Sequence, residues 1–204
     1  MKKAALFLLL LGFLLQTSSA VEIKALLGMN SSKYQFPSAG NALDTRARQG
    51  MSAGIGCATD LNAKIKLEIN AMYKDQGVKT TLQYSPDNPV DGIYVIRSIA
   101  VPLFFKYRLK ENASPYAALG PECVFVISHR LELPGQGENF DLSDNTKKFM
   151  FGYNAVLGYE LPLGRWALLA EFRYNRWLGS FLADTQAAVK MESLGFILGG
   201  VIRL

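Results

Sequence analysis

The sequence predicts an all-β fold, an eight-stranded antiparallel up-and-down transmembrane β-barrel. Three observations support this prediction. Apolar and polar residues alternate with a period of two through most of the chain, and long connections alternate with short ones. In the C-terminal strands, bulky apolar residues lie on the face opposite to glycines and charges. After the first 20 residues, no stretch has the apolar length of a membrane-spanning helix.

The composition of the 204-residue chain is that of one folded domain. Half of its residues are hydrophobic, 19% are charged and 11% are aromatic, which excludes a disordered chain. The formal charge of +5 is too small and too dispersed for nucleic-acid binding. Two cysteines and one histidine are too few for a disulfide scaffold or a Cys/His zinc site. We therefore expect no nucleic-acid partner, no metal and no cofactor.

Residues 1–20 have the features of a secretory signal peptide. Lys2 and Lys3 form the positive end, residues 4–15 are apolar, and the small residues Ser18 and Ala20 suit a cleavage site. This apolar stretch is shorter than the roughly 20 residues that a spanning helix needs, which argues against an uncleaved anchor. We expect the mature protein, residues 21–204, to be one barrel domain in the outer membrane of a Gram-negative bacterium.

Alternation bounded by turn residues predicts eight strands. They cover residues 21–31, 50–59, 63–82, 93–109, 115–130, 148–161, 166–178 and 190–204. Short connections follow the second, fourth and sixth strands, and longer polar connections follow the other strands. Outer-membrane barrels have this layout, with brief turns on the periplasmic side and extended loops at the cell surface.

The two faces of the predicted strands differ in residue size. In the sixth strand, Phe149, Phe151 and Leu157 share one face, and Gly152 and Gly158 share the other. The interior of an eight-stranded barrel is narrow, so small residues belong inside and bulky apolar residues outside. A soluble, lipocalin-like barrel would need the reverse arrangement. The pattern therefore favours a barrel whose apolar face contacts lipid.

The same parity places twelve charged residues in the lumen. Seven are basic and five are acidic, and buried charges persist only when they are paired or hydrated. We therefore expect a network of ion pairs that plugs the barrel. The residues of this lumen charge network are Glu22, Lys24, Lys64, Lys66, Glu68, Lys106, Arg108, Glu122, Glu160, Glu171, Arg173 and Arg203.

Aromatic residues gather near both ends of the predicted strands, where amphipathic rings favour the membrane interfaces. Near the short turns these are Tyr107, Tyr116, Tyr159 and Trp166. Near the long loops they are Tyr34, Tyr73, Tyr94, Phe149, Tyr174 and Trp177. We expect these two groups to form aromatic girdles.

Six segments of the chain have a shared pattern. They are GMSAGIG (50–56), AKIKLEINAMYKDQGVKT (63–80), IAVPLFFKYRL (99–109), PYAALGPECVF (115–125), FGYNAVLGYEL (151–161) and LLAEFRYNRWL (168–178). They resemble strands of the small outer-membrane β-barrel family of Bacteroidota that includes the PorT-like proteins. The resemblance implies an integral outer-membrane protein, but gives no reason to transfer PorT's role in secretion. Such barrels usually end in an aromatic residue, whereas this chain ends in Arg203 and Leu204.

The residue types for catalysis are sparse. The one histidine, His129, follows Ser128, and adjacent residues of a strand point to opposite faces. Ser128 would therefore face the lumen and His129 the lipid or a loop, which does not form a Ser–His pair. We expect no enzymatic activity. Cys57 and Cys123, with outward parity on strands that are not neighbours, should be free thiols.

Three functions remain open for such a barrel. We favour a structural role or an interaction through the surface loops, and the alternatives are a narrow channel or export-system accessory and, third, a lipid-modifying enzyme. The loop between Leu131 and Lys147 is acidic, with Glu132, Glu138 and Asp141 among its residues. Acidic loops can bind divalent ions that bridge lipopolysaccharide, or a protein. The expected partners are outer-membrane lipid, lipopolysaccharide and a protein at the loops.

Overall fold

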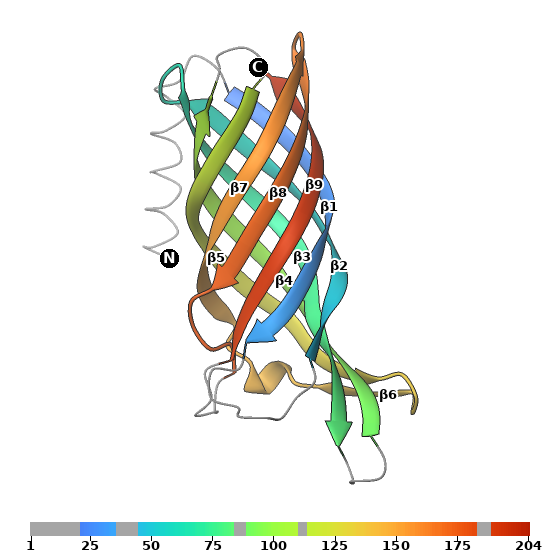
Figure 1. Ribbon diagram of the computed structural model, residues 1–204. Helices are drawn as coiled ribbons and strands as arrows, with labels where there is room; N and C mark the ends of the chain where they lie inside the picture. The colour runs from blue at the N-terminus through green and yellow to red at the C-terminus, as the bar shows by residue number, and fades with distance from the viewer. Residues whose placement is uncertain (1–20, 36–44, 84–88, 110–113, 183–188) are drawn as a thin grey trace.

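Eight strands of the computed structural model form one antiparallel ring (Figure 1). The structure describes residues 21–35, 45–83, 89–109, 114–182 and 189–204; the predicted signal peptide, residues 1–20, lies outside the described residues. The strands of the ring are β1 (Val21–Gln35), β2 (Thr45–Asp60), β3 (Ile65–Gln83), β4 (Pro89–Arg108), β5 (Ser114–Leu133), β7 (Phe149–Leu163), β8 (Trp166–Trp177) and β9 (Lys190–Arg203). In the described part of the chain, no helix is long and apolar enough to cross a membrane.

The ring closes between its first and last strands. β1 pairs with β2 on one side and with β9 on the other, from Glu22 opposite Arg203 to Gln35 opposite Lys190. Consecutive strands pair along the rest of the ring, including β4 with β5. The predicted up-and-down topology is therefore confirmed, and all eight predicted strands are present.

The strands extend further toward the long loops than the sequence pattern indicated. The β3–β4 ladder continues to Gln83 opposite Pro89, and Arg46 pairs with Lys79 in the β2–β3 ladder. Backbone pairing needs no apolar face where the sheet is exposed to solvent, so the ladder continues after the apolar alternation ends. The strand β6 (Glu138–Asp141), which we did not predict, pairs with the end of β5, and the 3-10 helix η1 (Ser143–Asn145) follows it. Figure 1 shows the β3–β4 and β5–β6 hairpins projecting beyond the ring, at the end away from the C-terminus.

The large apolar side chains lie on the outside of the ring. Leu157 and Phe172 are each 68% exposed, whereas Lys106 and Val201 on the inner face are 0% exposed. Glycine makes space in the narrow interior: a Cβ atom on Gly158 would lie 2.4 Å from the ring of Tyr116. Bulky apolar groups therefore point outward, and compact or charged groups point to the barrel axis.

A β-bulge in β5 overturns our prediction for Ser128 and His129. Arg97 lies opposite Ser128, but the next residue of β4, Ser98, lies opposite Val126, which leaves Ile127 without a partner. The extra residue reverses the side-chain alternation beyond it. His129 is consequently buried inside the barrel, and Ser128 lies on the other face.

Four aromatic residues that we assigned to the membrane girdles face the interior instead, and one of them, the half-buried Tyr94, packs against Tyr34 and His129. Tyr34, Tyr116 and Trp177 are at most 6% exposed. Their inward parity outweighs the preference of an aromatic ring for the interface. Gly158 leaves space for the ring of Tyr116, and Gly152 lies beside that of Trp177. Large exposed aromatics on the outer surface include Tyr107, Tyr159, Trp166, Tyr73 and Phe149. Cys57 and Cys123 are free and partly buried.

The orientation of the outer face predicts a depth-dependent cost for a new charge. Leu157 lies near the middle of β7. The substitution Leu157→Arg should therefore destabilise the barrel in phospholipid vesicles by about 2–4 kcal/mol. Leu163→Arg, at the turn-side end of the same strand, should cost about 0–1 kcal/mol. Urea unfolding in vesicles measures both values. Equal costs for the two variants would contradict the assigned outer face.

Candidate functional site: the charged lumen and its loop-side cap

The turn-side part of the lumen contains a branched cluster of ion pairs. Lys66 on β3 contacts Glu22 on β1, and Lys106 on β4 contacts Glu160 on β7 at 2.9 Å. Arg203 on β9 joins the two pairs, with Nε 3.1 Å from Glu22 and Nη2 2.7 Å from Glu160. Two carboxylates thus receive three cations at this end of the barrel.

The central part of the lumen contains two further pairs. Lys24 on β1 contacts Glu68 on β3, and Asn70 donates a hydrogen bond of 2.9 Å to the other Glu68 oxygen. Glu171 on β8 accepts hydrogen bonds from Arg173 Nε at 2.7 Å and from the Tyr116 hydroxyl at 2.5 Å.

Aromatic rings lie beside one cation of the turn-side cluster and one of the central part. The Lys106 ammonium lies 3.5 Å from the centre of the Tyr116 ring, and the Arg173 guanidinium lies 5.4 Å from that of Phe104. Cations attract the negative face of an aromatic ring, and the attraction is stronger away from water. The buried tyrosine that we had placed in a girdle is therefore part of the ionic layer.

A third layer lies closer to the loops. Lys74 on β3 contacts Glu122 on β5, and the Asn175 amide on β8 donates to the second oxygen of Glu122. Beyond it, the Gln76 amide on β3 donates to the Ser193 hydroxyl on β9 at 3.0 Å. The charge of the lumen therefore gives way to neutral polar groups toward the loops.

The structure brings most of the predicted lumen residues together, with exceptions at the ends. Nine of the twelve are buried: Glu22, Lys24, Lys66, Glu68, Lys106, Glu122, Glu160, Glu171 and Arg173. Arg108 is partly exposed and contacts Asp60 at 2.8 Å, and Arg203 is also partly exposed. The prediction for Lys64 is wrong: it is exposed, because β3 begins only at Ile65 and inward parity does not extend into the turn.

Sequence reasoning missed Lys74 as a lumen residue. It has the same even parity as Lys66 and Glu68 on the same strand, which was the signal that could have identified it. The amides Asn70 and Asn175 were missed as well, since the search was restricted to charged residues. They supply donors to Glu68 and Glu122, whose oxygens would otherwise be less fully satisfied.

An aromatic cluster closes the loop-side end of the barrel. Phe181, from the β8–β9 connection, is 1% exposed and packs with ring centres 4.8 Å from Tyr34, 5.6 Å from His129 and 6.0 Å from Trp177. We name these four residues the aromatic cap. The Phe181 carbonyl accepts the Lys147 backbone N–H at 2.8 Å, which ties Phe181 to the segment before β7.

His129 has a defined place in this cap. Its Nδ1 lies 2.8 Å from the Thr146 hydroxyl, and that hydroxyl donates to the Leu142 carbonyl at 2.8 Å. A hydroxyl has one proton to donate, so it accepts from His129, whose proton therefore lies on Nδ1. The histidine joins β5 to the segment that precedes β7.

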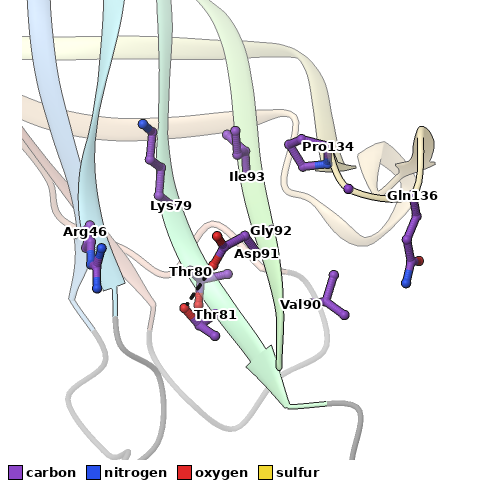
Figure 2. Close-up of a pocket in the computed structure, with 11 residues that line it drawn as sticks. Arg46, Lys79, Thr80, Thr81, Val90, Asp91, Gly92, Ile93, Pro134 and Gln136 are labelled. Carbon is purple, nitrogen blue, oxygen red and sulfur yellow. Dashed lines mark hydrogen bonds between the residues drawn. The ribbon is translucent and has the colours of Figure 1, made fainter. Parts of the chain in front are cut away.

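A surface cavity of about 600 Å³ lies on the loop side, between the β3–β4 hairpin and the β5–β6 turn (Figure 2). Arg46 and Lys79 lie at one side of it, and Pro134 and Gln136 at the other.

The Asp141 carboxylate of the acidic loop is exposed to solvent. Hydrogen bonds from Ser143 hold the pKa of this carboxyl below its usual value. Among the described residues, no group of three or more His, Cys, Asp or Glu side chains could hold a metal ion.

Comparisons with known proteins agree with this architecture. Residues 15–183 match the family model described as outer membrane protein beta-barrel domain. Outer membrane protein OprG from Pseudomonas aeruginosa is similar, with 11% identity, a TM-score of 0.56 and coverage of 92% of this chain and 96% of that one. Neisserial surface protein A is also similar, with 15% identity, a TM-score of 0.54 and coverage of 91% of this chain and 99% of that one.

At these identities the structural likeness shows the fold alone. A comparison with curated proteins gave no match. The family model, however, covers most of the sequence, including the segments that form β1 to β8. This chain therefore belongs to the outer membrane protein beta-barrel domain family, and its barrel lies in the outer membrane.

Proposed function

We propose that this protein is a closed, non-catalytic barrel with a plugged polar lumen, and that it serves a structural role or an interaction through its surface loops. The observation that carries the proposal is the balance of buried charge. In the lumen, five buried cations accompany five buried carboxylates: Lys24, Lys66, Lys74, Lys106 and Arg173 with Glu22, Glu68, Glu122, Glu160 and Glu171. The further buried carboxylate, Glu192, contacts Arg176 and not the lumen cations.

The direction of the ion pairs supports a plug. Lys24 with Glu68 joins β1 to β3, Lys74 with Glu122 joins β3 to β5, and Lys106 with Glu160 joins β4 to β7. Each of these pairs passes over an intervening strand of the ring. The side chains therefore extend from the wall into the lumen to reach partners beyond the adjacent strand, and they occupy space that a pore would need.

The surroundings of His129 support a structural role over a catalytic one. Its ring packs against Phe181 and its Nδ1 contacts Thr146, whereas Ser128 lies on the opposite face of the strand. A nucleophile and its base need side chains within hydrogen-bond reach of each other. A lipid-modifying enzyme is therefore the weakest of the three candidates.

The proposal also includes the family subgroup of this protein, its route of export and its partners. The six segments quoted above support a place among the PorT-like barrels of Bacteroidota, and residues 1–20 support export by a signal peptide that is then removed. Outer-membrane lipid and lipopolysaccharide are the proposed partners of the outer face. The exposed β5–β6 hairpin supports a further protein partner at the loops.

Reversing one charge in the lumen should destabilise the barrel. Glu171→Lys would place a cation beside Arg173 and remove the acceptor of Tyr116, and loss of a buried pair costs about 3–5 kcal/mol. The folded form, detected by heat-modifiable gel mobility in detergent, should melt at a lower temperature. The control Glu138→Lys reverses an exposed charge on β6 and should leave melting unchanged. An unchanged melting temperature for Glu171→Lys would disprove the lumen network.

Conductance in planar bilayers separates a closed barrel from the alternative of a narrow channel. Arg203, partly exposed at the turn-side mouth, is the observation that favours the alternative, because a rearrangement of its two ion pairs would open this end. We expect no steady current from the refolded wild-type protein, since further ion pairs and the aromatic cap lie behind Arg203. A stable ohmic current that increases in Arg203→Ala would instead support a channel.

A further inference from the structure

The third layer of the lumen holds an amine, a carboxyl group and an amide in one cluster. Lys74 Nζ on β3 contacts one oxygen of Glu122 on β5, and Asn175 Nδ2 on β8 donates to the other oxygen. The three residues are buried, with exposed fractions of 8%, 0% and 3%. Both nitrogens contact oxygens of the same carboxylate, so they lie within a few ångströms of each other. We name Lys74, Glu122 and Asn175 the lumen triad.

The cross-strand neighbours of the lumen triad are uncharged. They are Ser52 and Ser98 for Lys74, Pro102 and Gly152 for Glu122, and Asn154 and Ser193 for Asn175. Charges are costly away from water, and transfer of a proton from the Lys74 ammonium to Glu122 removes both of them. The amine that results has a free electron pair beside the carbonyl carbon of Asn175, and an amine nucleophile attacks such a carbon.

A further amide lies where the Asn175 oxygen needs a donor. Among the residues that the structure describes, Asn154 Nδ2 and Asn175 Oδ1 are both buried without a hydrogen-bond partner. The two residues are directly opposite on β7 and β8, a position at which side chains interact. Unsatisfied buried polar groups are rare in folded proteins. A donor at Asn154 would stabilise the negative charge that develops on the Asn175 oxygen during nucleophilic attack.

We propose that Lys74 and Asn175 become joined by an isopeptide bond inside the barrel, with Glu122 as the proton carrier. The Lys74 ammonium passes one proton to Glu122, and the electron pair of the amine attacks Asn175 Cγ. Glu122 then gives this proton to Asn175 Nδ2 while it takes a second proton from the attacking nitrogen. The Cγ–Nδ2 bond breaks and ammonia leaves. An amine and a primary amide thus become a secondary amide and ammonia, without an oxidant or another reactant.

The proposed bond would link strands that are not neighbours in the ring, because β3 pairs with β2 and β4, and β8 pairs with β7 and β9. A covalent link between distant parts of the chain restricts the unfolded state and so stabilises the folded one. The reaction removes one cation and leaves Glu122 protonated, so the buried charges still balance. The inference goes beyond the proposed function, which needs only the ion pairs.

A second group in the lumen has the same residue types but a different charge environment. Lys24 and Asn70 contact the two oxygens of Glu68. Glu68 also interacts electrostatically with Lys106 and Arg173. Protonation of Glu68 would leave these cations with less compensating charge, which is costly away from water. We therefore expect no bond between Lys24 and Asn70, and this group supplies the matched control.

Refolding in detergent tests the proposal, because the bond can form only when the three strands come together. The mass of the intact wild-type chain should fall by one ammonia molecule between the urea-unfolded and the folded samples. Trypsin should then release a branched peptide in which residues 67–79 and 174–176 are joined through Lys74 and Asn175. Cyclisation of an asparagine onto its own backbone also releases ammonia, but it leaves these two peptides separate.

Four variants assign the roles. Lys74→Arg keeps the charge but removes the nucleophile, Asn175→Ala removes the amide and Glu122→Gln removes the proton carrier, so each should give no branched peptide. Asn154→Ala should slow its formation about a hundredfold, as expected for the loss of one donor to a developing oxyanion. The matched control Asn70→Ala removes the amide of the other group and should react as the wild type does.

Complete folding of the wild-type protein without a change of mass would overturn the proposal. Heat-modifiable gel mobility reports on folding, and the result on the wild type decides even if a variant does not refold. A branched peptide that persists in Asn175→Ala, or a loss of water with Lys74 joined to Glu122, would contradict the assigned groups. Conductance of the same samples tests the closed lumen separately, so absence of the bond is distinguishable from failure of the proposed function.

Discussion

The interior of an eight-stranded barrel is wide enough for side chains but too narrow for a layer of bulk water around each of them. A charge that points inward therefore needs a partner of opposite sign across the lumen. The outer face carries the opposite requirement, because hydrocarbon accepts only apolar groups. Pairs such as Lys24 with Glu68 and Lys74 with Glu122 satisfy the first requirement, and exposed residues such as Leu157 satisfy the second.

These two requirements organise the molecule along its axis. From the turns to the loops, the lumen contains ion pairs, then neutral amides and hydroxyls, and then the aromatic cap around Phe181. The outer face changes in the reverse sense, from aromatic and aliphatic residues at the turns to exposed cations such as Lys33, Arg97 and Arg130 at the loops. The inside is thus charged where the outside is most apolar, and the inside becomes apolar near the level where the outside becomes charged.

Period-two alternation was sufficient to predict the eight strands, their order and the face of most residues, because each strand repeats the same pattern. It failed wherever the structure departs from that period. The bulge at Ile127 reversed the faces of Ser128 and His129, and the turn before Ile65 removed Lys64 from the lumen. Tyr116 and Trp177 were misplaced because residue type was given more weight than parity. The aromatic cap depends on the packing of Phe181 against Tyr34 of β1 and His129 of β5, a long-range contact that no local pattern reveals.

The central claim is that oppositely charged side chains are bound to each other inside the barrel, and a double-mutant cycle on Lys24 and Glu68 tests it most directly. The four proteins, wild type, Lys24→Met, Glu68→Gln and the double variant, are unfolded with urea in phospholipid vesicles. Each single change should leave a buried partner uncompensated, and the double variant should be more stable than the sum of the two losses implies, with a coupling energy of about 1.5 kcal/mol or more. Losses that add within about 0.5 kcal/mol would show that the two side chains do not interact and would contradict the account.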